Sequence, residues 1–305
     1  MSTSTTPTPT GGSLSLATLP AVLDAVCAQA GLDPAGARLI KFTNNAALRL
    51  ASAPVVVRIA GSRAISTSIT KVVNVAAWLA EHDMPTVRLL PGITQPVHAA
   101  GHAATLWEEV PATGPAPTGA DLGRILRRFH ALPEPGFELP RWDPFTRIRT
   151  RIDDARGIGP DDREWLLERC AETETAVRAL DYRLEPGPIH GDPFPGNLVP
   201  GPDGPVLCDF DGVSHGPREW DLTPVAVGRL RMNYPVDHHT PLAAAYGADV
   251  TAWPGFDVLR RVRELVLVTS VLPQLDSNPG LRAQWEPRYR SLRQSDTRTR
   301  WNTYR

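Results

Sequence analysis

The chain has 305 residues, of which 42% are hydrophobic, and its formal net charge is −1 at neutral pH. This length is sufficient to bury a sizeable core, either in one large domain or in two lobes. The balanced charge provides no general attraction to polyanions, so we expect neither a nucleic acid nor a membrane surface as a partner.

The cysteines and the N-terminal segment indicate a cytoplasmic location. Cys27, Cys170 and Cys208 are far apart and odd in number, so they suit neither a disulfide framework nor a metal site. No apolar run approaches the roughly 18 residues that a membrane span needs. Residues 1–13 are rich in Ser, Thr, Pro and Gly, which predicts a disordered tail instead of a signal peptide.

Residues 14–109 have the pattern of a small β-rich lobe. Helical spacing over residues 14–30 ends at a glycine, and a second amphipathic helix is predicted over residues 66–81. Alternating patterns between turn residues predict five strands, over residues 37–42, 46–50, 55–59, 87–90 and 103–108. The expected element is an antiparallel sheet with one helix inserted after its third strand.

Residues 110–117 contain three prolines and predict a hinge, because proline continues neither helix nor strand. Residues 118–305 then form a larger, mainly helical lobe. Helices are predicted over residues 120–131, 161–180, 221–230, 256–271 and 281–293. The fold class is therefore α+β, with two lobes joined by a short linker.

A polar constellation surrounds a short predicted hairpin in the second lobe. Residues 197–199, which begin with Asn197, and residues 206–208 are predicted as its two strands, residues 200–204 form the turn, and Asp209 follows the second strand. A hairpin brings its two ends together, so both side chains are expected to supply oxygen ligands to a hard cation such as Mg²⁺. Asp192 lies on the loop that enters the hairpin. An acid-rich turn without chemistry is the alternative, but this order and spacing favour phosphoryl transfer.

The motif resembles that of the aminoglycoside phosphotransferase and choline kinase group, whose members share the protein-kinase-like fold. The resemblance is carried by His190-Gly191-Asp192 and Asn197, by Asp209-Phe210-Asp211, and by Trp220-Asp221-Leu222 at the start of a helix. It runs from about residue 37 to residue 230, and it is more specific in the second lobe than in the first.

The resemblance implies a role for each motif residue. Asp192 is expected to orient and deprotonate the acceptor hydroxyl as the catalytic aspartate. Asn197 and Asp209 are expected to bind Mg²⁺, with ATP or GTP as the phosphate donor held by the first lobe. His190 and Asp221 are expected to support the catalytic loop through hydrogen bonds.

The first lobe departs from the family at the residues that hold the nucleotide phosphates. Arg58 occupies the strand position of the usual lysine, either as a phosphate contact or as a solvent-facing side chain. Val72 occupies the usual helix glutamate position, so Arg58 either lacks that support or receives it from another acid. Lys41 and Lys71 are the remaining cationic candidates for a phosphate contact, with Lys71 expected to be solvated. Asp211 is expected either to support the metal or to cap a turn.

Two further segments are expected to contact the nucleotide. Asn44 and Asn45 form a turn between two strands, where backbone N–H groups and small polar side chains suit a phosphate, although Asn-Asn is also ordinary turn chemistry. Glu108 and Val110 stand at the lobe boundary, where the main chain is expected to hydrogen-bond adenine.

The sequence does not identify the molecule that accepts the phosphoryl group. An aminoglycoside is polycationic and needs an acidic lining. Candidate acids are Asp153, Asp154, Asp161, Asp162 and Glu164, but the C-terminal stretch is basic. A nucleoside or macrolide antibiotic, or a related metabolite, is an equal candidate. The alternative function is a non-catalytic, nucleotide-binding pseudokinase that acts as a sensor or scaffold. The sequence does not indicate an oligomeric state.

Overall fold

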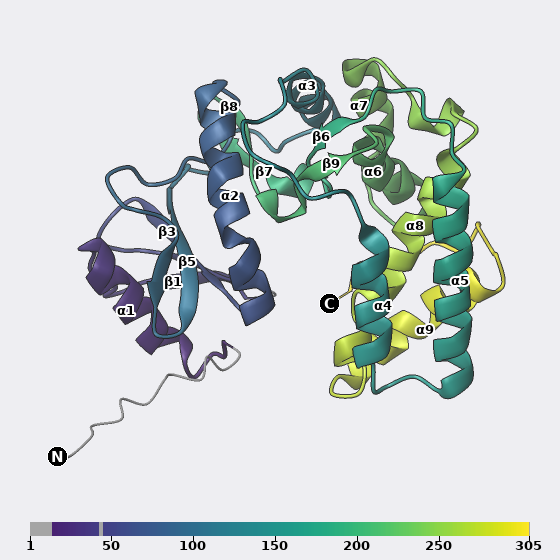
Figure 1. Cartoon of the computed structure of the whole chain (residues 1–305), viewed down its shortest axis with the longest axis horizontal. Helices are drawn as coiled ribbons and strands as arrows, with labels where there is room; N and C mark the ends of the chain where they lie inside the picture. The colour runs from purple at the N-terminus through teal and green to yellow at the C-terminus, as the bar shows by residue number, and fades with distance from the viewer. Residues whose placement is uncertain (1–13, 43–44, 305) are drawn as a thin grey trace. The chain divides into compact units, whose positions relative to one another are not determined.

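A computed structural model describes residues 14–42 and 45–304. The chain divides into two compact units. The first combines the residues up to Pro115 with Val199–Asp211, and the second combines Ala116–Leu198 with the residues from Gly212 onward. A sheet dominates the first unit and helices dominate the second, so the predicted two-lobe α+β class is confirmed (Figure 1).

The first unit contains a five-stranded antiparallel sheet in the order β1-β2-β3-β5-β4. Its strands are β1 (Arg38–Phe42), β2 (Asn45–Arg49), β3 (Val55–Ala60), β4 (Val97–Ala99) and β5 (His102–Glu108). Helix α2 (Arg63–Glu81) is inserted after β3, as the sequence predicts, and α1 (Leu19–Ala30) precedes the sheet.

The predicted strand over residues 87–90 is wrong. This segment forms only isolated bridges, through Thr86 to Leu207 and through Leu89 to Trp107. Pro85 and Pro91 bracket it, and proline lacks the N–H that a continuous ladder requires. The short strand β4 pairs with β5 instead.

Helix α1 covers one face of the sheet. Its Val22 and Val26 belong to one buried apolar cluster with Val57 and Ile59 of β3. The helix begins later than predicted, at Leu19, and carries a proline in its first turn, where no N–H partner is needed. Figure 1 shows α1 and α2 on opposite sides of the sheet.

The other face of the sheet carries the polar side chains. Ala47 of β2 is paired with Lys41 on one side and with Arg58 on the other. Arg58 is paired in turn with Thr105 of β5. Residues paired directly across strands point to the same face, so the register lines Lys41 and Arg58 along one row.

The predicted hairpin forms from β7 (Leu198–Gly201) and β8 (Gly204–Leu207). Gly204 has a φ of 126°, a conformation that side chains with a Cβ rarely adopt. Leu207 ties the hairpin to the first unit, because its N–H donates to Pro85 O at 2.8 Å and its C=O accepts from Val87 N at 3.0 Å.

The second unit is built mainly from helices α3 (Gly119–Phe129), α4 (Pro144–Asp154), α5 (Pro160–Arg178), α6 (Glu219–Arg231), α7 (His239–Tyr246), α8 (Phe256–Thr269) and α9 (Pro279–Arg293). Strands β6 (Gly187–Ile189) and β9 (Ser214–Gly216) pair antiparallel beside them. In the described ranges, none of the helices is both long and apolar enough to cross a membrane.

Helix α4 was not predicted from the sequence. It is strongly polar, and only Phe145, Ile148 and Ile152 are buried along it. The Asp143 side chain caps its N-terminus by accepting from the N–H groups of Phe145 and Thr146. The Asp-Pro start and the apolar spacing of three and four residues are the signals that identify it.

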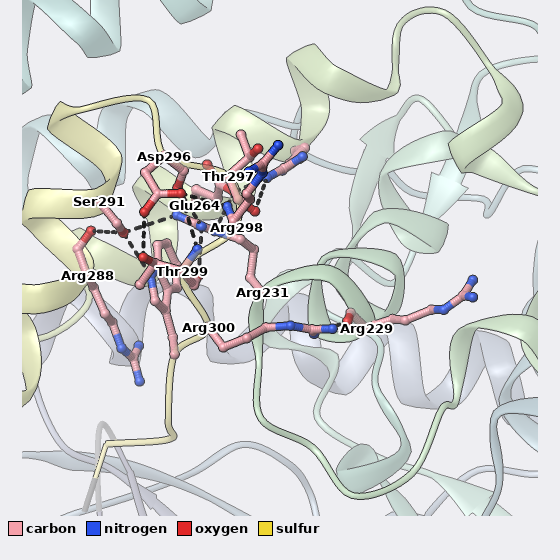
Figure 2. A network of polar contacts seen from close by, with 12 residues as sticks. Arg229, Arg231, Glu264, Arg288, Ser291, Asp296, Thr297, Arg298, Thr299 and Arg300 are labelled. Atoms are coloured by element: carbon pink, nitrogen blue, oxygen red, sulfur yellow. Dashed lines mark hydrogen bonds and ion pairs between the residues drawn. The ribbon is translucent and has the colours of Figure 1, made fainter.

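A buried arginine fastens the C-terminal segment to the helices (Figure 2). Arg231 is 1% exposed, and its Nε lies 2.8 Å from Glu264 of α8. It donates at 2.8 Å to the carbonyls of Asp296 and Thr299. Its guanidinium stacks on Trp301 at 4.1 Å from the ring centre. One side chain thus links α6, α8 and the chain end.

Candidate active site

The loop after β6 turns sharply at a glycine. Gly191 has a φ of 88°, and a Cβ at this position would lie 2.2 Å from the carbonyl oxygen of Gly212. Only glycine fits both constraints without displacing backbone. The turn carries the chain from the buried His190 to the partly exposed Asp192 within two residues.

The Asp221 side chain holds the main chain of this loop in place. It is fully buried, and it accepts from the N–H of His190 at 2.6 Å and from that of Gly191 at 2.8 Å. His130 Nε2 lies 3.0 Å from the same carboxylate. The Trp220 ring nitrogen donates to Gly191 O at 2.7 Å. Asp221 stands in the first turn of α6, where the helix dipole also favours a carboxylate.

Asp192 is held at its main chain and at its carboxylate. The side-chain nitrogen Nδ2 of Asn197 donates to the main-chain oxygen of Asp192 at 2.9 Å. This bond fixes the predicted metal ligand to the loop that carries the predicted base. Arg263 of α8 lies 2.8 Å from Asp192 Oδ1. The Asp192 side chain is still 53% exposed, so it is accessible to an acceptor.

Arg263 was not predicted as a site residue. It lies 71 positions after Asp192 in the sequence, within a helix that contains other arginines. No local motif distinguishes it from the exposed Arg261 two positions earlier. Only the packing of α8 in the second unit brings it to the loop.

In the first unit, Asp209 begins the Asp-Phe-Asp segment with a φ of 69°. This left-handed conformation is uncommon outside glycine and often occurs at functional sites. The Asp209 side chain is 48% exposed, and Arg58 Nη2 lies 3.9 Å from it. Asp209 follows the hairpin directly, as predicted, and its metal role stays a prediction.

The structure identifies the acid that accompanies Arg58. Arg58 forms a hydrogen-bonded ion pair with Asp211, whose side chain is 25% exposed. Val72 is 1% exposed in the core and supplies no charge. Asp211 is therefore the acid that pairs with Arg58, and the Arg58 side chain, which is 19% exposed, does not face solvent as one interpretation expected.

Lys71 joins the same cluster. Its Nζ donates to Asp211 O at 2.5 Å, so the expectation of a solvated lysine is wrong. Burial raises the pKa of Asp211, but the charge of Arg58, the hydrogen bonds with Asp209 and Arg58 and the charge of Lys71 outweigh it and hold the pKa below its usual value.

The other predicted nucleotide contacts are the Asn44–Asn45 turn and the main chain of Glu108 and Val110. Asn44 lies outside the described residues, and Asn45 is the first residue of β2. The N–H of Glu108 donates to Arg88 O at 2.9 Å, so it is already paired. The main chain of Val110 has no hydrogen-bond partner within the described ranges. Of the two hinge residues, Val110 is the better candidate for an adenine contact.

The acids considered for an aminoglycoside do not gather at the catalytic loop. Asp162 accepts from the Tyr289 hydroxyl at 2.7 Å and lies 2.6 Å from Arg293. The others, Asp153, Asp154, Asp161 and Glu164, are exposed on α4 and α5. As far as the described residues show, none of the set pairs with a residue of the catalytic loop.

The fold and the motifs together define a class of enzyme. A small antiparallel sheet, a helical second unit, a His-Gly-Asp loop and an Asp-Phe-Asp segment are the parts of a kinase-like phosphotransferase. A model of the phosphotransferase enzyme family matches residues 40–265, which is well over half of the chain. The chain belongs to this family. The predicted family and the predicted enzyme class, a small-molecule kinase, are confirmed.

Solved structures support the same fold. The amicoumacin kinase hAmiN, in complex with AMP-PNP, Ca²⁺ and Ami, matches with a TM-score of 0.68 at 15% identity, over 94% of this chain and 98% of that one. A choline/ethanolamine kinase family protein from Mesorhizobium loti matches at 0.63 and 16% identity, over 91% and 93%. An aminoglycoside-3'-phosphotransferase of type VIII matches at 0.59 and 19% identity, over 80% and 98%. A comparison with the curated proteins gave no match.

Proposed function

We propose that this chain transfers the γ-phosphoryl group of ATP or GTP to a hydroxyl of a small molecule, with Asp192 as the base. The observation that carries the proposal is the rigid attachment of the Asp192 loop to Asp221. A half-exposed carboxylate on a fixed loop is suited to orient a hydroxyl for in-line attack. The acceptor O–P bond forms, the bond to the β-phosphate oxygen breaks, the hydroxyl proton passes to Asp192, and a nucleoside diphosphate leaves.

The first unit is proposed to hold the nucleotide. Arg58 and Lys41 lie on one row of the sheet, and Lys71 donates to the main-chain carbonyl of Asp211, whose carboxylate pairs with Arg58. Three cations suit the charge of a triphosphate, and a guanidinium binds phosphate with two donors. The main chain of Val110, which has no partner among the described residues, is proposed to hydrogen-bond the adenine edge.

The proposed metal is Mg²⁺, with Asn197 and Asp209 as its protein ligands. An amide oxygen and a carboxylate are hard ligands of the kind that Mg²⁺ takes together with phosphates and water. The left-handed backbone of Asp209 and its half-exposed carboxylate fit this role. When bound, the ion would neutralise developing charge on the phosphates.

The acceptor class and the location complete the proposal. The similar structures include an amicoumacin kinase and an aminoglycoside phosphotransferase, which supports an antibiotic or a related hydroxylated metabolite as the acceptor. The cysteines at positions 27, 170 and 208 are free thiols, which supports the reducing cytoplasm as the site of action.

A screen for ATP consumption against antibiotics and related metabolites tests the proposal, with mass spectrometry to detect a phosphate adduct. We expect adduct formation that requires a divalent cation and that is lost in Asp192→Ala. Nucleotide binding without transfer to any hydroxylated compound would instead support the alternative, a non-catalytic nucleotide-binding protein.

A further inference from the structure

Arginines from two helices surround the proposed catalytic aspartate. Arg263 of α8 is ion-paired with Asp192 at 2.8 Å. Arg151 of α4 reaches the next turn of α8, where its Nη1 lies 3.5 Å from the carbonyl oxygen of Val266. Arg147 stands four positions before Arg151, and residues with this separation share one face of a helix. The same face of α4 thus presents two guanidinium groups toward this region.

Only one arginine of this cluster is paired with a carboxylate within the described ranges. Arg263 is paired with Asp192, whereas Arg147 and Arg151 have no ion pair there. Burial, and then the charge of Arg147, lower the pKa of Arg151 to about 10; Arg263 also lowers it, and Asp192 opposes them.

The two unpaired arginines, Arg151 and Arg147, have few other polar contacts within the described ranges. Arg151 makes one long hydrogen bond, 3.5 Å to the carbonyl oxygen of Val266, and no ion pair. Arg147 is exposed and has neither a hydrogen bond nor an ion pair in that part of the chain. A partly buried guanidinium without a carboxylate is costly, and an anion that arrives with a ligand removes that cost.

A polycationic acceptor does not suit this environment. Its ammonium groups would approach the hydroxyl-binding aspartate past the guanidinium groups of these arginines, and like charges disfavour binding. A purely structural role for the arginines explains Arg263, which has a carboxylate partner. It does not explain Arg147 and Arg151, which have none among the residues that the structure describes.

We propose that the acceptor carries an acidic group, a carboxylate or a phosphate, which is bound by Arg151 and Arg147 while its hydroxyl faces Asp192. This inference rests on the proposed function and specifies its substrate class. Arginine binds both kinds of anion with two parallel donors, so the two guanidinium groups provide affinity and orientation together.

The test is anion binding to the full chain, first saturated with ADP and Mg²⁺ so that the nucleotide site does not take up the probe. Inorganic phosphate and acetate are titrated by calorimetry into the wild type and into Arg151→Gln. We expect at least one anion to bind the wild type, and its Kd to rise about tenfold in Arg151→Gln, since a hydrogen bond to a charged group is lost. The anion that binds more tightly distinguishes phosphate from carboxylate recognition.

Two further variants make the test specific. Arg147→Gln removes an exposed side chain and cannot disturb the core, and we expect it to weaken the same anion by a smaller factor. Arg261→Gln, an exposed arginine of α8 with no partner within the described ranges, is the matched control and should bind the anion as the wild type does. Equal binding by Arg151→Gln and Arg261→Gln, or no anion binding by the wild type, would overturn the inference.

The failure of the inference differs from the failure of the proposed function. A chain that does not bind ADP in the first step contradicts the proposed function. A chain that binds ADP but neither anion contradicts the inference alone. An acceptor identified by the screen gives a second measure, because its KM should rise about tenfold in Arg151→Gln while the KM for ATP stays unchanged.

Discussion

Two aspartates attached to the same loop have opposite environments. Asp221 is fully buried and accepts two backbone N–H groups, whereas Asp192 is 53% exposed and meets an arginine. The first carboxylate is committed to the loop backbone and to His130, and the second remains accessible at the surface. The difference indicates that rigidity and reactivity in this loop are assigned to separate residues, so each can be removed independently.

Two arginines, one from each unit, differ in a similar way. Arg58 of the first unit is balanced by Asp211 and lies near Asp209. Arg151 of the second unit has no ion-pair partner within the described ranges. The paired arginine is positioned in advance for a ligand of fixed geometry, and the unpaired one is available to an anion.

The largest effect is expected from Asp192→Ala. Removal of a general base typically costs 10²–10⁴ in rate, so turnover should fall by about a thousandfold. Because Asp192 is largely exposed, we expect thermal stability and ADP binding to stay close to those of the wild type. Turnover and calorimetric ADP binding, measured on one preparation, check both parts. Unchanged turnover would contradict the role of Asp192.

Asp221→Ala should affect stability first. The variant leaves two buried N–H groups without an acceptor, each worth about 1–3 kcal/mol, so the free energy of unfolding should fall by about 3 kcal/mol. Urea unfolding measures this change. Asp257→Ala, an exposed acid in the first turn of α8, is the matched control and should cost about 0.5 kcal/mol. Similar losses in both variants would show that Asp221 is not the anchor of the loop.

Asp211→Asn should act on the nucleotide alone. Without the carboxylate, Arg58 loses its positioning partner, and the KM for ATP should rise about tenfold with a smaller change in kcat. Asp203→Asn changes an exposed aspartate in the nearby hairpin turn and should leave both constants unchanged. A variant whose KM for ATP equals that of the wild type would mean that Arg58 needs no acid.

Much of the fold and of the motif followed from the sequence because the signals are local. Turn residues around short alternating segments predicted the sheet, and the order of Asp192, Asn197 and Asp209 predicted the kind of chemistry. The strand over residues 87–90 failed because prolines at both ends interrupt its hydrogen bonding. Helix α4 was missed because its face is mostly polar.

The remaining site residues depend on tertiary packing. Nothing around Lys71 or Asp211 in the sequence indicates that they meet, since they are separated by 140 positions. Arg263 likewise has no local motif, and Arg151 lies in a helix that the sequence did not reveal. Charged residues without a motif are usually solvated, so only coordinates distinguish those that converge from those that do not.

The central claim, phosphoryl transfer to a hydroxyl with Asp192 as the base, is tested most directly by ³¹P NMR of ATP. The wild type and Asp192→Ala are each incubated with ATP, Mg²⁺ and a pool of hydroxylated compounds, some with and some without acidic groups. The account predicts that the wild type replaces the γ-phosphate signal with those of ADP and a phosphate monoester, and that Asp192→Ala leaves ATP intact. Intact ATP in both samples, or inorganic phosphate as the only product of the wild type, would contradict it.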